Sequence, residues 1–196
     1  MSSTSKQVRV IRKDPGIKLT RNNYRKKALP YLLVDFDNRC AYSMEKLFTL
    51  LEVDHFNPNL KKDLIQKYEN LFPASRHCNK NKRATWPSKK MMQQGIRFLD
   101  CTKESDYGTC IFEDLESHKL IGTTPAAKWH ILQLDLNAPF LIKHRKERAD
   151  LHQIIKNCFV RLRTPIDKSK PFFDLIKEIR KKLDDMIPQI PPPPTS

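Results

Sequence analysis

The chain has 196 residues, of which 39% are hydrophobic, and this is enough apolar material for one folded core with an appended part. Its 37 Lys and Arg against 22 Asp and Glu give a net charge of +15, which indicates a partner rich in phosphate or an anionic membrane surface. Only 4 glycines are present, which disfavours the glycine-rich phosphate loops of Rossmann and P-loop folds.

Targeting signals are not apparent, and the cysteine pattern agrees with an intracellular protein. No apolar run approaches the roughly 18 residues of a membrane span, and the charged N-terminus does not carry the apolar core of an export signal. The five cysteines are odd in number and widely spread, so we expect reduced thiols and a cytoplasmic protein.

The first part of the chain is strongly basic. Residues 1–29 contain nine Lys and Arg and a single acid, Asp14. A run of this kind is either a solvated arm or an arm that binds phosphates, and the sequence favours neither. We expect the folded core to occupy residues 30–90.

The core contains two strand candidates and a short helix. Residues 51–56 form the first strand candidate, and a polar turn follows it. Residues 70–74 form the second. Residues 77–90 are expected to begin as a helix that stops before Pro87, because the residue before a proline disfavours helical geometry.

Residues 91–187 are predicted to add a hairpin and helices that pack on the core. Residues 107–123 have the pattern of a β-hairpin, with arms at 108–112 and 119–123. Thr124 and Pro125 are then the N-cap and first residue of a helix that runs to about Leu134.

Two further helices are indicated by apolar residues at helical spacing, which most simply pack against the core. The first stripe consists of Leu151, Ile154, Ile155 and Cys158, and the second of Phe172, Ile176, Ile179, Leu183 and Met186. Residues 188–196 form a proline-rich tail without helix or sheet. The expected fold class is therefore α+β.

The chemistry of the sequence is concentrated around Asp54, His55 and Asn79. Neighbours in a strand point to opposite faces, so of Asp54 and His55 one can bind a metal ion while the other faces a substrate. Carboxylate and amide oxygens suit Mg²⁺ or Mn²⁺, which makes Asp54 and Asn79 the candidate ligands. A neutral imidazole beside such a cation can act as a general base, and this is the role we predict for His55.

A dense group of cations surrounds these residues, with no acid among them. Its members are Arg76, Lys80, Lys82, Arg83, Lys89 and Lys90. A metal ion, a general base and a cationic patch are together the groups that an enzyme uses to bind and hydrolyse a phosphodiester.

Residues 40–82 resemble the HNH endonuclease family, whose core is the ββα-metal fold. The resemblance includes the Asp54-His55 pair, Pro58, Asn70-Leu71, and Cys78-Asn79 followed by Lys82. The nine residues from Asn70 to Asn79 match the family's spacing, and Asn79 makes this the HNN variant. The resemblance implies that His55 is the base, that Asp54 and Asn79 hold one Mg²⁺ or Mn²⁺, that Asn70 joins the catalytic set by bracing a loop, and that Lys82 contacts phosphate.

The sequence departs from the family at the positions of a structural zinc. Many members carry two CxxC pairs, whereas this chain has Cys40 with Ser43 and Ser75 with Cys78. Two thiolates do not complete a tetrahedral zinc site. His77 is the alternative third ligand, but we expect no structural zinc.

A second resemblance, to HNH subunits of anti-phage defence systems of the Septu and retron-associated types, rests on Gly122, residues 129–134, Leu136-Asn137 and Arg145. It implies an ATPase or another defence subunit as partner, and the alternative is an ordinary packing layer. The predicted partner of the whole chain is nucleic acid, DNA before RNA, with no membrane. A silent HNH-fold scaffold that binds nucleic acid without cutting it is the alternative function.

Overall fold

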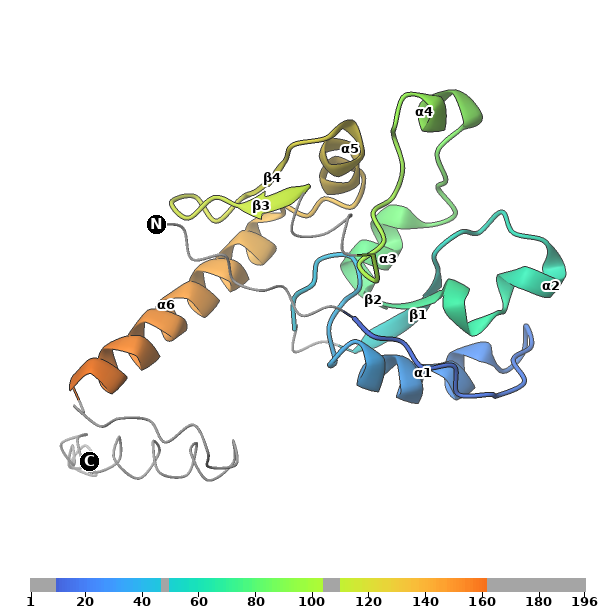
Figure 1. Ribbon diagram of the computed structural model, residues 1–196, viewed down its shortest axis with the longest axis horizontal. Helices are drawn as coiled ribbons and strands as arrows, with labels where there is room; N and C mark the ends of the chain where they lie inside the picture. The colour runs from blue at the N-terminus through green and yellow to red at the C-terminus, as the bar shows by residue number, and fades with distance from the viewer. Residues whose placement is uncertain (1–9, 47–49, 104–109, 162–196) are drawn as a thin grey trace, which may run out of the picture. The chain divides into compact units, whose positions relative to one another are not determined.

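The computed structural model describes residues 10–46, 50–103 and 110–161, and within them the fold is of the α+β class, as expected (Figure 1). The helices are α1 Tyr24–Asp35, α2 Lys62–Ile65, α3 Arg76–Lys82, α4 Lys89–Gln93, α5 Pro125–Gln133 and α6 Pro139–Arg161, with a 3₁₀ turn at Tyr68–Asn70. The strands are β1 Leu51–His55, β2 Leu71–Ser75, β3 Ile111–Glu113 and β4 Leu120–Gly122. The chain divides into two compact units, residues 1–144 and 145–196, and every helix and strand named above lies in the first except the part of α6 after residue 144.

The two predicted core strands pair with each other. β1 and β2 are antiparallel, with Leu51 opposite Ser75 and His55 opposite Leu71. All five residues of β2 are buried, and Leu51, Val53 and Asp54 of β1 are buried with them. The 3₁₀ turn immediately precedes β2, so the second strand begins one residue later than the sequence indicated.

Helix α3 follows β2 without a loop and contacts both strands (Figure 1). Ser75 ends the strand and caps the helix, since its Oγ accepts a hydrogen bond from the Cys78 backbone N–H at 3.3 Å. The helix ends at Lys82, before Pro87 as predicted, and Arg83 leaves it with a φ of 50°. Short helix α4 was not predicted.

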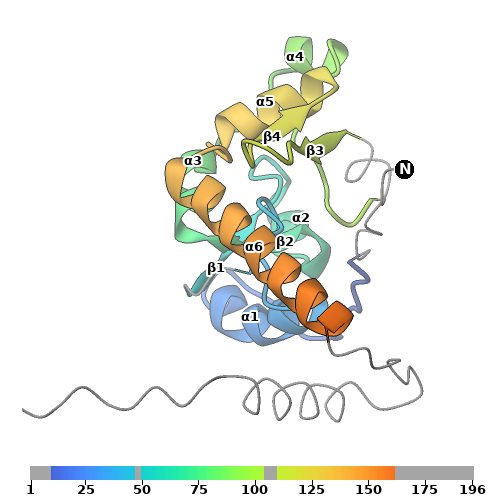
Figure 2. The same cartoon turned by 90° about the vertical axis from the view of Figure 1, so that its left-hand side faces the viewer.

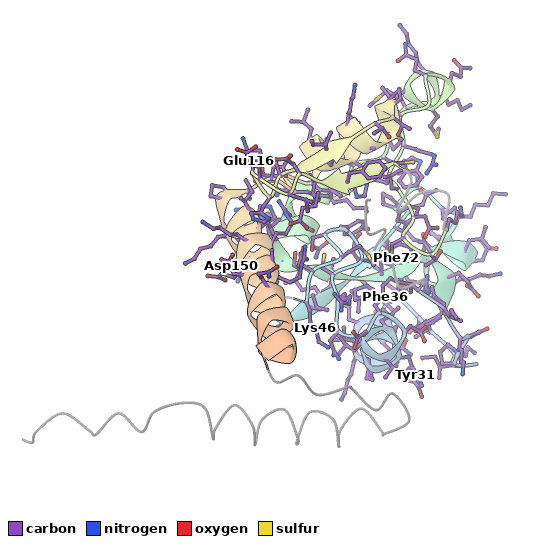
Figure 3. All side chains as sticks on the ribbon, turned by 60° about the vertical axis from the view of Figure 1, so that its left-hand side comes forward. Tyr31, Phe36, Lys46, Phe72, Glu116 and Asp150 are labelled. Atoms are coloured by element: carbon purple, nitrogen blue, oxygen red, sulfur yellow. The ribbon has the colours of Figure 1, made fainter. Side chains whose placement is uncertain are left out.

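The basic N-terminal segment is part of the fold from residue 10 onward, which corrects the expected boundary at residue 30. Helix α1 begins at Tyr24 and buries Tyr24, Ala28 and Leu32, which lie four residues apart on one face. Pro30 lies inside this helix, although a proline usually marks a helix boundary. Beyond α1, the rings of Phe36 and Phe72 pack together at 5.6 Å between centroids, while Tyr31 lies on the exposed side of α1 (Figure 3).

Arg12 bonds this segment to the backbone at the start of β2. Its guanidinium donates to the backbone carbonyls of Tyr68, Glu69 (2.7 Å) and Leu71 (2.9 Å). It also lies over the rings of Tyr68 and Phe72, at 4.8 and 5.2 Å from their centroids. Residues 10–29 therefore include a structural anchor as well as exposed cations.

A hairpin forms where one was predicted, but its first strand is 111–113 in place of 108–112, of which residues 108 and 109 lie outside the described residues. The helix after it forms as predicted, and β3, β4 and α5 lie side by side (Figure 2). The Thr124 hydroxyl accepts a hydrogen bond from the Ala127 N–H at 3.2 Å, and Pro125 is the first helical residue. Gly122 is required where β4 meets α5, because a Cβ atom there would lie 2.6 Å from the Lys128 backbone nitrogen.

Helix α6 contains the helix predicted around residues 151–158 but begins earlier, at Pro139. The side chains of that apolar stripe, the stripe from Phe172 to Met186 and the tail 188–196 lie outside the described residues. Within the described part of the chain, no helix is both long enough and apolar enough to cross a membrane.

Candidate metal and nucleic-acid site

The alternation of β1 places Asp54 and His55 on opposite sides, as expected from the sequence. Asp54 is 7% exposed and points toward α3, where its Oδ2 is 2.9 Å from the Lys82 ammonium. The Tyr42 hydroxyl donates a hydrogen bond to the same oxygen. Both contacts engage Oδ2, so Oδ1 is the oxygen with which Asp54 would bind a cation.

Lys82 is fully buried, and its position argues against the phosphate contact predicted for it. Its ammonium bonds to the Asp54 carboxylate and also donates to the His55 carbonyl oxygen at 2.8 Å. Burial lowers the pKa of Lys82, and the Asp54 carboxylate partly offsets that effect. Lys82 therefore joins α3 to the end of β1 and holds the backbone of the candidate base.

His55 lies at the partly exposed end of β1. Its ring packs on Tyr24 of α1, with centroids 4.6 Å apart, and its Nε2 is 3.3 Å from Gln66 Oε1. In the tautomer whose Nε2–H donates to Gln66, Nδ1 carries the lone pair that can accept a proton. Tyr24 and Gln66 thus orient the imidazole, and neither was singled out in the sequence.

Asn70 is buried and braces the loop after β1. Its Oδ1 accepts from the Asn57 N–H at 2.9 Å, and its Nδ2 donates to the carbonyls of Asn57 and Ile65 at 3.1 and 3.0 Å. These contacts occupy both ends of the amide. Asn70 therefore acts on the site through the loop that leads away from His55.

Asn79 lies on the side of α3 that faces β1, one helical turn before Lys82. Its Nδ2 donates to Glu52 Oε2 at 2.5 Å. Glu52 and Asp54 are two residues apart on the strand and share a face, so two residues of β1 meet two residues of α3. This arrangement brings the predicted ligands Asp54 and Asn79 to the same junction and adds Glu52.

The remaining predicted cations are exposed, and two of them share one face of α3. Arg76 and Lys80 lie four residues apart on the helix, and Arg83 directly follows its last residue. Lys89 and Lys90 are exposed on α4. Because Asn79 is adjacent to Lys80 on the helix, the cationic face borders the candidate cation site.

The four positions of the incomplete CxxC pairs do come together. The Cys40 and Cys78 thiols hydrogen-bond to each other, with Ser43 and Ser75 beside Cys40, and both thiols are buried. Burial, the largest influence, raises the pKa of Cys40, but the hydrogen bonds from Cys78, Ser75 and Ser43 together lower it below the ordinary value. Two thiols and two hydroxyls are a poor set of ligands for zinc. That the protein binds no structural zinc remains a prediction.

No group of three or more His, Cys, Asp or Glu side chains in the described ranges is arranged to hold a metal ion. The junction of β1 and α3 offers carboxylates and one amide instead. Such a donor set fits Mg²⁺, which is commonly held by one or two carboxylates with water completing its coordination.

Replacing Tyr42 by Phe is expected to cost about 1.5–3 kcal/mol of stability at neutral pH, the usual worth of a hydrogen bond to a charged group. Burial, with the Asp54 carboxylate, raises the pKa of Tyr42 well above 10.0. A raised folded-state pKa gives stability that is present below pH 10 and is lost as pH rises further. The difference between wild type and Tyr42→Phe should therefore shrink above pH 10 by about 1.4 kcal/mol per pH unit. Urea unfolding from pH 8 to 11 measures it, and a constant difference would contradict it.

Comparison of the chain with protein-family models, with curated proteins and with solved structures found no match.

Proposed function

We propose that this protein is an HNH endonuclease with a ββα-metal core that hydrolyses phosphodiester bonds in nucleic acid, with DNA as the preferred substrate. The observation that supports it is the junction of an antiparallel strand pair with the helix directly after it. Asp54 bonds to Lys82 and Asn79 bonds to Glu52 across this junction, and His55 lies at the end of the first strand. These are the positions that the HNH resemblance assigns to ligands and base.

In this proposal each residue has a distinct task. Asp54 Oδ1 and the amide oxygen of Asn79 would hold Mg²⁺ or Mn²⁺, and the bound ion would stabilise negative charge on the phosphate. His55 accepts a proton from water at Nδ1, while Gln66 and Tyr24 fix its ring. The exposed cations of α3 and α4 hold the phosphate backbone beside the site.

The proposal is tested with the full chain and supercoiled plasmid in Mg²⁺ or Mn²⁺, with and without chelator. We expect nicking that the chelator stops. Asn79→Ala should abolish nicking and weaken Mg²⁺ binding at least about 10-fold, whereas the matched control Asn22→Ala, at an exposed position, should behave as wild type.

Nicking that persists in chelator, or in Asn79→Ala, would overturn the proposed mechanism. A wild-type protein that binds DNA but does not nick it with either metal would favour the alternative, a nucleic-acid-binding scaffold.

Affinity for duplex DNA is expected to depend strongly on salt. If the five exposed cations Arg76, Lys80, Arg83, Lys89 and Lys90 contact phosphates, log K should fall with log salt at a slope near −4.5, about −0.9 per contact. Replacing Lys89 and Lys90 by Ala should flatten the slope by up to about 2 and weaken all sequences alike.

Fluorescence anisotropy across a salt series measures this slope. The matched control replaces Lys119 and Lys128, which are exposed on the hairpin and α5, and should leave the slope unchanged. Affinity that does not vary with salt would show that these cations do not bind the phosphates of DNA.

A further inference from the structure

Glu52 is an exposed acid that is held in one place by the candidate site. Its Oε2 accepts a hydrogen bond from Asn79 Nδ2 at 2.5 Å, across the gap between β1 and α3. It lies on the same face of β1 as Asp54. An exposed glutamate is normally free to sample many rotamers, so a direct bond to a predicted ligand gives it a definite position.

The bond also fixes the orientation of Asn79. The nitrogen and oxygen of a side-chain amide lie in one plane, on opposite sides of the Cβ–Cγ axis, so engaging Nδ2 determines where Oδ1 points. Because Glu52 accepts only from the nitrogen, it directs the oxygen of Asn79 away from its own carboxylate. Asn79 Oδ1 is the atom that a hard cation requires.

The charge balance at the junction gives Glu52 a second task. Lys82, at 2.9 Å, neutralises the Asp54 carboxylate, and Asn79 is uncharged. Asp54, Asn79 and Lys82 together therefore carry no net charge, which is a weak attraction for a divalent cation. Glu52 supplies the one negative charge that Lys82 does not cancel.

We infer that Glu52 is a positioning residue for the divalent cation, which orients the amide of Asn79 and provides the net negative charge of the junction. This inference rests on the proposed function, because it concerns the same cation. It adds a residue to which the HNH resemblance, as stated above, gives no role.

Mn²⁺ binding to the full chain without nucleic acid tests the inference, measured by electron paramagnetic resonance of the free ion. Glu52→Ala, which removes both the hydrogen bond and the charge, is expected to weaken binding about 100-fold. Glu52→Gln keeps an oxygen that accepts from Asn79 and is expected to weaken binding about 10-fold. The matched control is Glu69→Gln, an exposed acid near the motif, which should bind as wild type.

Two other measurements separate this effect from a structural one. The thermal unfolding midpoint and the DNA affinity in chelator should be unchanged in both Glu52 variants, because the side chain is exposed and outside the cationic face. If both Glu52 variants bind Mn²⁺ as wild type does while Asn79→Ala binds it weakly, the inference about Glu52 is wrong and the cation site stands. If wild type and Asn79→Ala bind Mn²⁺ equally, the cation site itself is wrong.

Discussion

His55→Ala is expected to lower the rate of plasmid nicking by about 10²–10⁴-fold, the usual contribution of a general base. The fold should survive, since the ring lies at the partly exposed end of β1. Lys82 bonds to the carbonyl oxygen of His55, not to its ring, so that contact remains in the variant. DNA affinity in chelator should also remain, because the cationic face is untouched.

The matched control is His118→Ala, which removes a histidine that pairs with Glu113 on the hairpin. Single-turnover nicking at saturating Mg²⁺ compares the two variants with wild type. A His55→Ala protein that nicks at the wild-type rate would remove His55 from the mechanism.

Lys82→Met is expected to destabilise the first unit by about 3–5 kcal/mol, because it leaves the buried Asp54 carboxylate without its cation. Lys82 is 0% exposed and the Asp54 side chain 8% exposed, so solvent cannot replace the lost partner. The matched control, Lys80→Met on the exposed face of the same helix, should change stability by no more than about 0.5 kcal/mol.

The double variant Asp54→Asn with Lys82→Met removes both charges and should be more stable than Lys82→Met alone. Urea unfolding followed by circular dichroism measures all three proteins. A Lys82→Met protein as stable as wild type would show that the Asp54–Lys82 pair does not hold α3 to β1. The phosphate contact predicted for Lys82 would then again be the better account of this residue.

Local signals were sufficient where one short stretch determines the structure. The Thr124-Pro125 pair predicted the start of α5 to the residue, because capping depends on atoms three positions apart. The strand expected at residues 70–74 and the helix expected from residue 77 each begin within one residue of β2 and α3. Helix α1 was missed since Pro30 and the surrounding cations obscure an apolar face that is complete only when β1 and β2 pack on it.

The parts of the site that sequence reasoning missed depend on contacts between distant residues. Lys82 has the same side chain as Lys80 two positions away, but Lys82 lies on the side of α3 that packs on β1 and is buried, whereas Lys80 is exposed. The sequence alone does not distinguish Glu52 from other solvated acids near the motif, because its bond to Asn79 spans 27 residues. Residue types indicated candidate cation ligands and a candidate base. Which of their atoms face the site depends on the contacts between α3 and β1.

The Arg12 contact has a consequence for the order in which the unit assembles. The guanidinium reaches the Tyr68 carbonyl across 56 residues of chain, so the contact requires closing a long loop. During synthesis residue 12 emerges before its acceptors at residues 68–71 and can bond to them only after they have been made. The segment around residue 12 is therefore expected to dock late, and long-range closures of this kind slow folding.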